Sequence, residues 1–315
     1  MSYKIGIIGF GKMGKIRYNA IKKIPGFIVE VISDPNNIDV KLPNVSINQL
    51  IDNKDIDIVI ICTPNYLNKK LTIKCLNNKK HVFCEKPPAF TAKDIKEIIS
   101  AEKKSQKKLM YGFNHRHHDS IIKMKEIVDG KEFGEVIWMR GRYGKSVDKN
   151  YFKEWRAKKK YSGGGILIDQ GIHMLDLFLY LADDFDVIKS EISNQYWKLE
   201  VEDNAFVILK NSKSGVTASL HSTMTQWRHL FSLEVFLENG YMVLNGLLTS
   251  TKSYGEEVLS IAKNRSSSPS VVWRDEEKIK YISDNSWNYE INHFFNSIIN
   301  NKKIEIDNSD DAFKL

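Results

Sequence analysis

A glycine-rich turn near the start of the chain, Gly9-Phe10-Gly11-Lys12-Met13-Gly14, constrains the fold more than any other feature. It follows the apolar run Lys4–Ile8 directly and opens a segment with helical character. Glycines in this pattern permit a tight turn and let the backbone approach a pyrophosphate, while the helix N-terminus offers free N–H groups to the anion. Because strand, turn and helix occur in the required order, the turn predicts a Rossmann domain. The expected cofactor-binding residues are Gly9, Phe10, Gly11, Lys12, Met13 and Gly14.

An acidic residue at the end of the second predicted strand supports the same interpretation. Asp34 lies 20 residues after Gly14, where a carboxylate can accept hydrogen bonds from both hydroxyls of an adenosine ribose. The alternative is that Asp34 only begins a turn. No basic residue follows in Pro35–Val40 to receive the 2′-phosphate of NADP. The sequence therefore predicts NAD as the cofactor.

Short apolar runs alternate with longer amphipathic segments through the first 118 residues. This alternation is typical of βαβ units, in which helices cover both faces of a parallel sheet. The expected strands are Lys4–Ile8, Ile28–Ile32, Asp57–Ile61, His81–Cys84 and Leu109–Tyr111. The expected helices are Lys12–Lys23, Ser46–Asn53, Leu67–Asn77 and Thr91–Lys104.

The pattern changes after Arg116. Strand-like segments separated by turn signals fill most of residues 185–282, which is typical of a mostly antiparallel sheet. We therefore predict an α/β fold with a Rossmann domain over 1–118 and an α+β domain with a large, open-faced sheet over 119–315. The expected helices are Ser120–Asp129, Ile166–Leu181 and Asn288–Asn300. The expected strands are Val136–Tyr143, Glu191–Trp197, Ala205–Leu209, Gly215–Ser222, Phe231–Leu237 and Gly240–Leu244.

Three further segments, together with the glycine turn, match the pattern of one family. Thr63-Pro64-Asn65 follows the third predicted strand, Glu85-Lys86-Pro87 follows the fourth, and the segment from Gly163 to His173 (GGGILIDQGIH) opens the long helix. In this order and spacing the chain resembles the Gfo/Idh/MocA family, named after glucose–fructose oxidoreductase, inositol dehydrogenase and rhizopine catabolism. The resemblance covers nearly the whole chain and is specific for fold, but not for one substrate.

Three residues of these motifs have the chemistry of a dehydrogenase site. Asp169 and His173 are four residues apart on one predicted helix, so they share a face. Lys86 carries a charge that can polarise a hydroxyl or carbonyl, and the imidazole of His173 suits proton exchange with an alcohol. A single helical histidine is more often structural. The resemblance, however, implies that Lys86, Asp169 and His173 are a catalytic triad, with His173 as the general acid/base.

The resemblance also implies further binding residues. The residues expected to bind the cofactor are Thr63, Pro64, Asn65, Glu85, Lys86, Asn114, Trp155 and Arg156. Expected to bind the substrate are Lys86, Arg116, Asp169, His173 and Arg228. The sequence departs from the family at Asn68, where a histidine is common, and its last predicted helix is barely begun at Leu315.

Arg228 is a candidate because of its neighbour as well as its charge. Trp227 and Arg228 lie side by side between two predicted strands. Arginine binds phosphate or carboxylate through a planar fork of donors, and tryptophan offers a surface on which a ring can stack. The pair therefore favours an anionic or nucleotide-linked sugar. The alternative is a hairpin at a subunit interface, where both residue types are enriched.

Metal and nucleic-acid sites are not predicted. Adjacent histidines such as those in His115–His118 rarely chelate one ion, and no carboxylate or cysteine has a matching spacing. The net charge of +8 is concentrated in the first 118 residues, where Lys-rich helix faces that keep the domain in solution are the preferred explanation and nucleic acid or a small polyanion such as a dinucleotide is the alternative. The charged segments lack the aromatic residues of a nucleic-acid surface.

Three cysteines and no apolar run of membrane-spanning length favour a cytoplasmic protein without a membrane partner.

The protein is predicted to be an NAD(H)-dependent oxidoreductase that acts on a secondary alcohol or ketone of a sugar, sugar nucleotide or cyclitol. One hypothesis for its role is the biosynthesis of surface-polysaccharide sugars. The alternatives are an inositol-type dehydrogenase, an NAD-dependent glycosidase, and a non-catalytic dinucleotide sensor. A sensor needs the glycines but not the triad, so the triad argues against it. By resemblance, the open face of the second sheet forms a homodimer or homotetramer.

Overall fold

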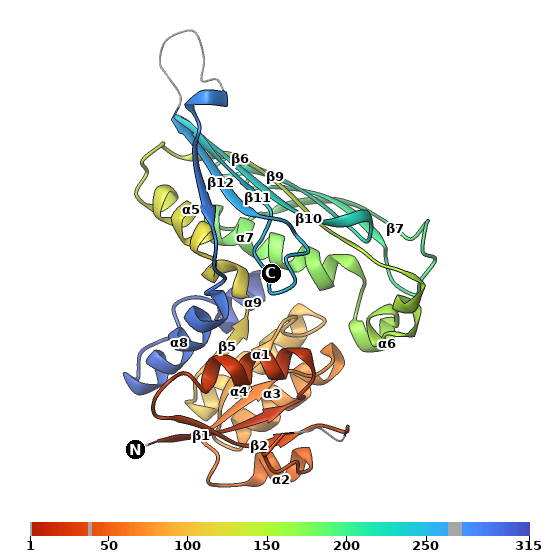
Figure 1. Ribbon diagram of the computed structural model, residues 1–315, viewed down its shortest axis with the longest axis vertical. Coiled ribbons are helices and arrows are strands. Elements are labelled where there is room, and N and C mark those ends of the chain that lie inside the picture. The colour runs from red at the N-terminus through yellow and green to blue at the C-terminus, as the bar shows by residue number, and fades with distance from the viewer. Residues whose placement is uncertain (1, 37–39, 264–272) are drawn as a thin grey trace. The chain divides into compact units, whose positions relative to one another are not determined.

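The computed structural model describes residues 2–36, 40–263 and 273–315, and it divides into two compact units (Figure 1). The first unit comprises Met1–Asn114 and Ser286–Lys314, and the second comprises His115–Asn285. This division differs from the prediction of one boundary at residue 118, because the chain returns to the first unit after Asn285.

A parallel sheet forms the centre of the first unit. Its five strands have the order β2-β1-β3-β4-β5. An isolated parallel bridge joins Ile32 to Asn44 beyond β2, and with this bridge counted as a short strand the order is the 3-2-1-4-5-6 of a Rossmann domain. The strands are β1 (Tyr3–Ile8), β2 (Phe27–Ser33), β3 (Ile58–Ile61), β4 (His81–Glu85) and β5 (Leu109–Gly112). All five predicted strands are confirmed. They contain runs of Ile and Val that are buried on both faces, which is typical of parallel sheets.

Four helices follow the strands of the first unit at the predicted places. Two of them begin at side-chain caps: Ser46 and Gln49 form a capping box, and the hydroxyl of Thr91 accepts from the Asp94 N–H. Such caps satisfy backbone donors that have no partner within the helix. The helices are α1 (Lys12–Ile21), α2 (Ile47–Asp52), α3 (Asn68–Asn77) and α4 (Ala92–Ser105).

The end of the chain completes the core of the first unit. Helix α8 (Ser286–Ile299) buries its apolar face there, and the ring of Phe295 stacks on that of Phe27 with centroids 3.8 Å apart. The Tyr111 N–H on β5 donates to the Asp307 carbonyl at 2.8 Å, and the short helix α9 (Ser309–Lys314) contacts α4. These contacts explain why residues 286–314 belong to the first unit.

An eight-stranded sheet forms the second unit, in the order β13-β12-β11-β10-β6-β9-β8-β7. Every neighbouring pair is antiparallel except β6 and β9, so the prediction of a mostly antiparallel sheet is confirmed. Strand β10 begins six residues before its predicted start, and its pairing with β6 is irregular between Thr225 and Leu230. The strands are β6 (Val136–Ser146), β7 (Val187–Ser193), β8 (Asn204–Lys210), β9 (Thr217–Thr223), β10 (Thr225–Leu237), β11 (Gly240–Asn245), β12 (Glu257–Lys263) and β13 (Glu277–Tyr281).

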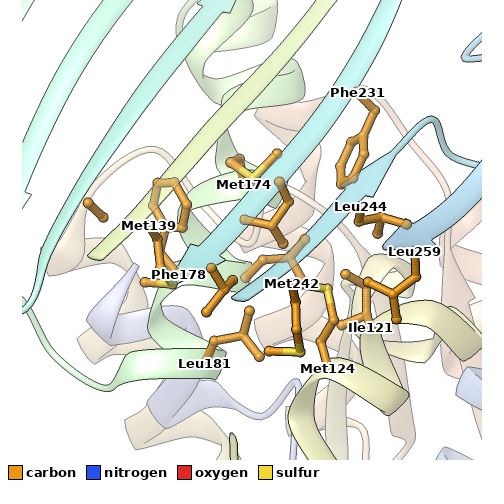
Figure 2. Close-up of a cluster of buried hydrophobic side chains, with 14 of the residues drawn as sticks. Ile121, Met124, Met139, Met174, Phe178, Leu181, Phe231, Met242, Leu244 and Leu259 are labelled. Carbon is orange, nitrogen blue, oxygen red and sulfur yellow. The ribbon is translucent and has the colours of Figure 1, made fainter. Parts of the chain in front are cut away.

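One face of this sheet is covered by helices α5 (Asp119–Asp129) and α7 (Ile172–Ala182) (Figure 1). Side chains of both helices meet the buried side chains of the central strands, as Figure 2 shows. Labelled there are Ile121, Met124, Met139, Met174, Phe178, Leu181, Phe231, Met242, Leu244 and Leu259. The helices thus bury one sheet face, as the prediction of an open-faced sheet requires.

The other face of the sheet carries aromatic and apolar side chains that no helix among the described residues of this unit covers. Trp138 stacks on Phe236 with ring centroids 4.1 Å apart, and Phe206 stacks on His221 at 4.0 Å. Ile208 beside Phe206 is 53% exposed. We call this surface the open face.

The stretch Lys159–Ala182 is the one segment, within the part of the chain that the structure describes, long and apolar enough to cross a membrane. This segment differs from the expectation that the chain has no apolar run of membrane-spanning length. More than half of the most apolar window of this stretch is buried. Because α7 within it packs against the sheet, it is explained as a core helix of the second unit.

Candidate active site

The glycine turn of the first unit has a backbone that only glycine permits at two positions. Gly9 has a φ of +86°, and a Cβ built on it would lie 2.5 Å from the carbonyl oxygen of Cys62. A Cβ on Gly14 would lie 2.2 Å from the Gly9 carbonyl oxygen. These distances are far below van der Waals contact with rigid backbone atoms, so the two glycines are required by the turn itself.

Gly11 differs from its neighbours because its surroundings are open. A Cβ built there would meet no atom of the described chain within 4 Å. Gly11 is the N-cap of α1, and neither a capping side chain nor an acidic residue in the first turn neutralises the N-terminus of this helix. The free N–H groups and the positive end of the helix dipole therefore face a space that suits an anion. These features fit the pyrophosphate of a dinucleotide.

Asp34 lies beside the same turn. One carboxylate oxygen accepts from the Phe10 N–H at 2.7 Å, and the other accepts from the Asn36 N–H at 2.9 Å. The side-chain amide of Asn44 donates to the Asp34 carbonyl and accepts from its N–H, both at 3.0 Å. The carboxylate is thus fixed at the end of β2 next to the glycine turn, with lone pairs left for further donors.

The turn that carries Lys86 is held by Asn68, at the first position of α3. The Asn68 amide is buried and donates to the carbonyls of Glu85 at 3.0 Å and Pro87 at 2.9 Å. Its oxygen accepts from the Thr63 hydroxyl at 3.1 Å. Asn68 therefore joins the turns after β3 and β4 and fixes the backbone on both sides of Lys86. A buried amide does this where the family often has a histidine.

We expect Asn68→Ala to lower the free energy of unfolding by about 1–3 kcal/mol, because two buried carbonyls lose their donor. Urea denaturation followed by circular dichroism would measure this loss. Asn77→Ala, at an exposed position of the same helix, is the matched control and should stay within about 0.5 kcal/mol of the wild type. Equal stability of the two variants would contradict a role for Asn68 in holding the Lys86 turn.

Glu85 forms an internal ion pair that the sequence analysis did not anticipate. Its carboxylate accepts from Nε of the buried Arg17 at 2.7 Å, and Arg17 forms a second ion pair with Glu290 of α8. The Arg17 guanidinium lies over the Phe83 ring, 4.4 Å from its centroid. Burial opposes the charge of Arg17, but the two carboxylates outweigh it and raise its pKa. Glu85 thus ties β4 to α1, and we do not retain it as a cofactor-binding residue.

In the second unit, Asp169 and His173 lie on one helical segment with an irregular start. Asp169 is in a single π-helical turn (Leu167–Gly171), and His173 is in the first turn of α7. The sequence predicted a regular helix here. The Ile166 and Leu167 N–H groups donate to the main chain and side chain of Glu202, which fixes the start of this segment. Single π-turns within helices are frequent at functional sites.

The Asp169 carboxylate lies between two cations. One oxygen pairs with the ammonium of Lys145 on β6, and the other is 3.7 Å from Nε of Arg156. Arg156 belongs to the short helical turn Trp155–Ala157, and its guanidinium lies 4.4 Å from the centroid of the Trp155 ring. The structure therefore brings Asp169 and Arg156 together, as expected of one site.

His173 is stacked on a second histidine. The rings of His115 and His173 are nearly parallel, with centroids 3.8 Å apart. Nε2 of His115 is 3.0 Å from the hydroxyl of Tyr143, which is buried in β6. Burial raises the pKa of Tyr143 well above its usual range, so this hydroxyl stays protonated. The stack and the phenol together fix the orientation of the His115 ring. The His115 ring in turn covers one face of the His173 ring.

The other predicted residues of the second unit serve different partners. Arg116 binds Asp176 of α7 through both prongs of its guanidinium, at 2.9 and 2.6 Å. His118 contacts Glu257 at 3.0 Å. His115, Arg116 and His118 therefore bind different partners within this unit, and we do not retain Arg116 as a substrate-binding residue. Trp227 and Arg228 are both exposed on β10, and Trp227 is 97% exposed.

Lys145 is the site residue that sequence reasoning missed. A signal for it exists, because Met139, Gly141, Tyr143 and Lys145 alternate along β6 on the face that the helices cover. A lysine that continues such an apolar face is rarely placed there without an acidic partner.

The glycine turn, the flanking Asp34 and the parallel sheet define a dinucleotide-binding domain of the Rossmann class. A family model described as an oxidoreductase family with an NAD-binding Rossmann fold matches residues 3–113, and a GFO/IDH/MocA C-terminal domain matches residues 121–243. The chain belongs to the GFO/IDH/MocA family of oxidoreductases. The predicted family, fold class and NAD cofactor are thereby confirmed.

Several curated proteins are similar to this chain. Levoglucosan dehydrogenase of Pseudarthrobacter phenanthrenivorans is 29% identical over 208 residues, which cover 60% of this chain and 53% of that enzyme. Myo-inositol 2-dehydrogenase of Thermotoga maritima is 26% identical over 268 residues, with 79% and 77% covered. The match thus spans about half the length of the first enzyme and three quarters of the second.

Solved structures share the fold over nearly the whole chain. A levoglucosan dehydrogenase in complex with NADH and levoglucosan has a TM-score of 0.88 at 21% identity, with 99% of this chain and 94% of that chain covered. An aldose-aldose oxidoreductase from Caulobacter crescentus complexed with glycerol has a TM-score of 0.84 at 24% identity, with 100% and 94% covered. These likenesses establish a common fold for both units.

Proposed function

We propose that this protein is an NAD(H)-dependent oxidoreductase that transfers hydride to or from a secondary alcohol or ketone of a sugar, sugar nucleotide or cyclitol. The observation that carries this proposal is that Asp169 and His173 lie on one helical segment, in a chain whose first domain binds NAD. The similar curated dehydrogenases act, by their names, on levoglucosan and myo-inositol. Both compounds carry adjacent hydroxyls, which suit a site with several hydrogen-bonding groups.

Each residue of the triad has a chemical role in this proposal. Bound NAD accepts or supplies the hydride. As the alcohol carbon loses hydride, the hydroxyl proton passes to His173, and it returns from His173 in the reverse direction. Asp169 accepts a hydrogen bond from a substrate hydroxyl. Lys86 donates to the reacting oxygen and stabilises the negative charge that develops on it.

The proposed binding residues are those that the sequence motifs indicate. For the cofactor we retain the glycine turn, Asp34, the segment Thr63-Pro64-Asn65, Lys86, Asn114, Trp155 and Arg156. For the substrate we retain Lys86, Asp169, His173 and Arg228. The exposed Arg228 favours a sugar with a carboxylate or phosphate, and with a sugar nucleotide the enzyme would serve the synthesis of surface-polysaccharide sugars.

Self-association and compartment are also part of the proposal. The stacked rings of the open face, Trp138 with Phe236 and Phe206 with His221, favour a homodimer or homotetramer formed through this face. The three cysteines are unpaired, which favours a reducing, cytoplasmic location. Size-exclusion chromatography with light scattering would test the oligomer. A monomer at micromolar concentration would contradict it.

A substrate panel tests the activity. We expect NAD⁺ reduction, followed by the absorbance of the reduced nicotinamide, with at least one of myo-inositol, levoglucosan, simple glucosides, hexuronates and nucleotide-linked sugars. Release of a chromogenic phenol from an aryl glycoside without net NAD⁺ reduction would instead identify a glycosidase. NADH binding without turnover of any member would favour the sensor.

We expect Asp34→Ser to change coenzyme preference. The carboxylate accepts hydrogen bonds from the ribose of NADH and repels the 2′-phosphate of NADPH, so its removal should weaken NADH binding and narrow the gap between the two coenzymes. Fluorescence titration of each variant with NADH and NADPH measures this. Similar affinities of the wild-type protein for both coenzymes would contradict the role of Asp34.

A further inference from the structure

Lys145 is a charged residue to which the proposed chemistry assigns no role. Its side chain is 11% exposed and leaves β6 on the face that the helices cover. An ammonium group in such a place requires compensation, because burial of an unpaired charge is strongly unfavourable. The contacts of Lys145 therefore indicate its role.

The charges around Asp169 form two pairs. Lys145 pairs with one oxygen of Asp169. Arg156 is 3.7 Å from the other oxygen, but it also has its own partner in Glu154, 3.5 Å from Nη1. Lys145 is therefore the cation committed to Asp169. Its ammonium lies 3.4 Å from the Tyr151 hydroxyl and 4.7 Å from the centroid of the Tyr151 ring, so its position is fixed from a second side.

We propose that Lys145 is a positioning residue that holds the Asp169 carboxylate ionised and in one orientation, so that its remaining lone pairs are presented to a substrate hydroxyl. Lys145 comes from the sheet and Asp169 from the helical segment, so the pair fixes the π-helical turn against β6. This inference rests on the proposed function, because it concerns how Asp169 binds the substrate.

The surrounding titratable groups support a charged Lys145. Burial lowers the pKa of Lys145, but Asp169 outweighs this and the net pKa is raised. Burial and the nearby Lys145 lower the pKa of His229 on β10, which leaves its ring neutral. Burial raises the pKa of Tyr254 to about 12, and burial likewise raises those of Tyr143 and Tyr151. The charged groups beside the pair include Arg156 and its partner Glu154.

Lys145→Met tests the proposal, since it keeps most of the length of the unbranched side chain and removes its charge. We expect kcat/KM to fall on the order of 10- to 100-fold, as for a misoriented binding group, with unchanged NADH affinity. A loss of kcat/KM on the acid side, beyond that caused by protonation of His173, should begin at higher pH than in the wild type, because the Asp169 carboxylate loses the cation that favours its charged form. Lys145→Arg should recover part of the rate. Lys153→Met, at an exposed position near Tyr151, is the matched control and should behave as wild type.

A stability cycle tests the pair without any turnover. Lys145→Met and Asp169→Asn should each lower the Tm, because each removes the ion pair between the two residues, and the double variant should lose less than the sum. Lys145→Gln replaces the Met variant if that variant does not fold. Additive losses, or an unshifted pH profile in a folded Lys145 variant, would overturn the positioning role. A wild-type protein that turns over no substrate would overturn the proposed function instead, and the cycle would still decide whether Lys145 and Asp169 are coupled.

Discussion

Replacement of His173 by alanine is expected to lower kcat by a factor on the order of 10² to 10⁴, the usual contribution of a positioned general acid/base. The reaction releases a proton whenever the alcohol loses hydride, and the imidazole on α7 is the group proposed to take it. Loss of the ring also removes the partner on which His115 stacks at 3.8 Å. Steady-state kinetics with the best substrate of the panel would measure the change.

Two controls separate a catalytic effect from a structural one. NADH affinity should stay within a factor of about two, because the glycine turn belongs to the other unit of the chain. His221→Ala removes a histidine from the open face of the sheet, where it stacks on Phe206, and should leave kcat unchanged. A His173→Ala variant with wild-type turnover would remove His173 from the mechanism. An equal loss in both variants would point to damaged folding.

The sheet of the first unit was predictable strand by strand, whereas the place of the chain's end was not. Continuous runs such as Ile58–Ile61 are buried on both faces and have few alternatives. The amphipathic pattern of Asn288–Asn300 shows which side of that helix is apolar, but nothing local states which core it joins. The stacking of Phe295 on Phe27, far apart in the sequence, decides this. Long-range packing of this kind is invisible to a periodicity argument.

The candidate site divides in the same way between local and long-range information. Gly9, Gly11 and Gly14 were predictable because their roles depend on the turn itself. The partners of Glu85 and Arg116 were not, because Arg17 and Asp176 are 68 and 60 residues away from them. The side chains of Glu85 and Arg116 were predicted to bind a ligand, but each forms an ion pair with a residue of its own chain. The start of the π-helical turn at Asp169 was likewise hidden, since the Leu167 N–H there donates to the distant Glu202.

Gly11 and Gly14 allow the cofactor proposal to be tested apart from folding. Gly11→Ala adds a Cβ into open space at a negative φ of −69° and in an extended backbone, so the Tm should stay close to the wild-type value. The same methyl group occupies the space proposed for the pyrophosphate. We expect NADH affinity to fall on the order of 100-fold or more, equivalent to the loss of about two charge-assisted hydrogen bonds. Isothermal titration calorimetry with NADH would measure this.

Gly14→Ala is the contrasting variant. Its Cβ would lie 2.2 Å from the Gly9 carbonyl oxygen, so the turn must move before any ligand is considered. We expect the free energy of unfolding to fall by about 3 kcal/mol, toward the upper end for overpacking, together with NADH affinity. If Gly11→Ala also lost stability, its effect on NADH would say nothing specific about the cofactor. If Gly11→Ala kept both stability and NADH affinity, the pyrophosphate would have to bind elsewhere than at the N-terminus of α1.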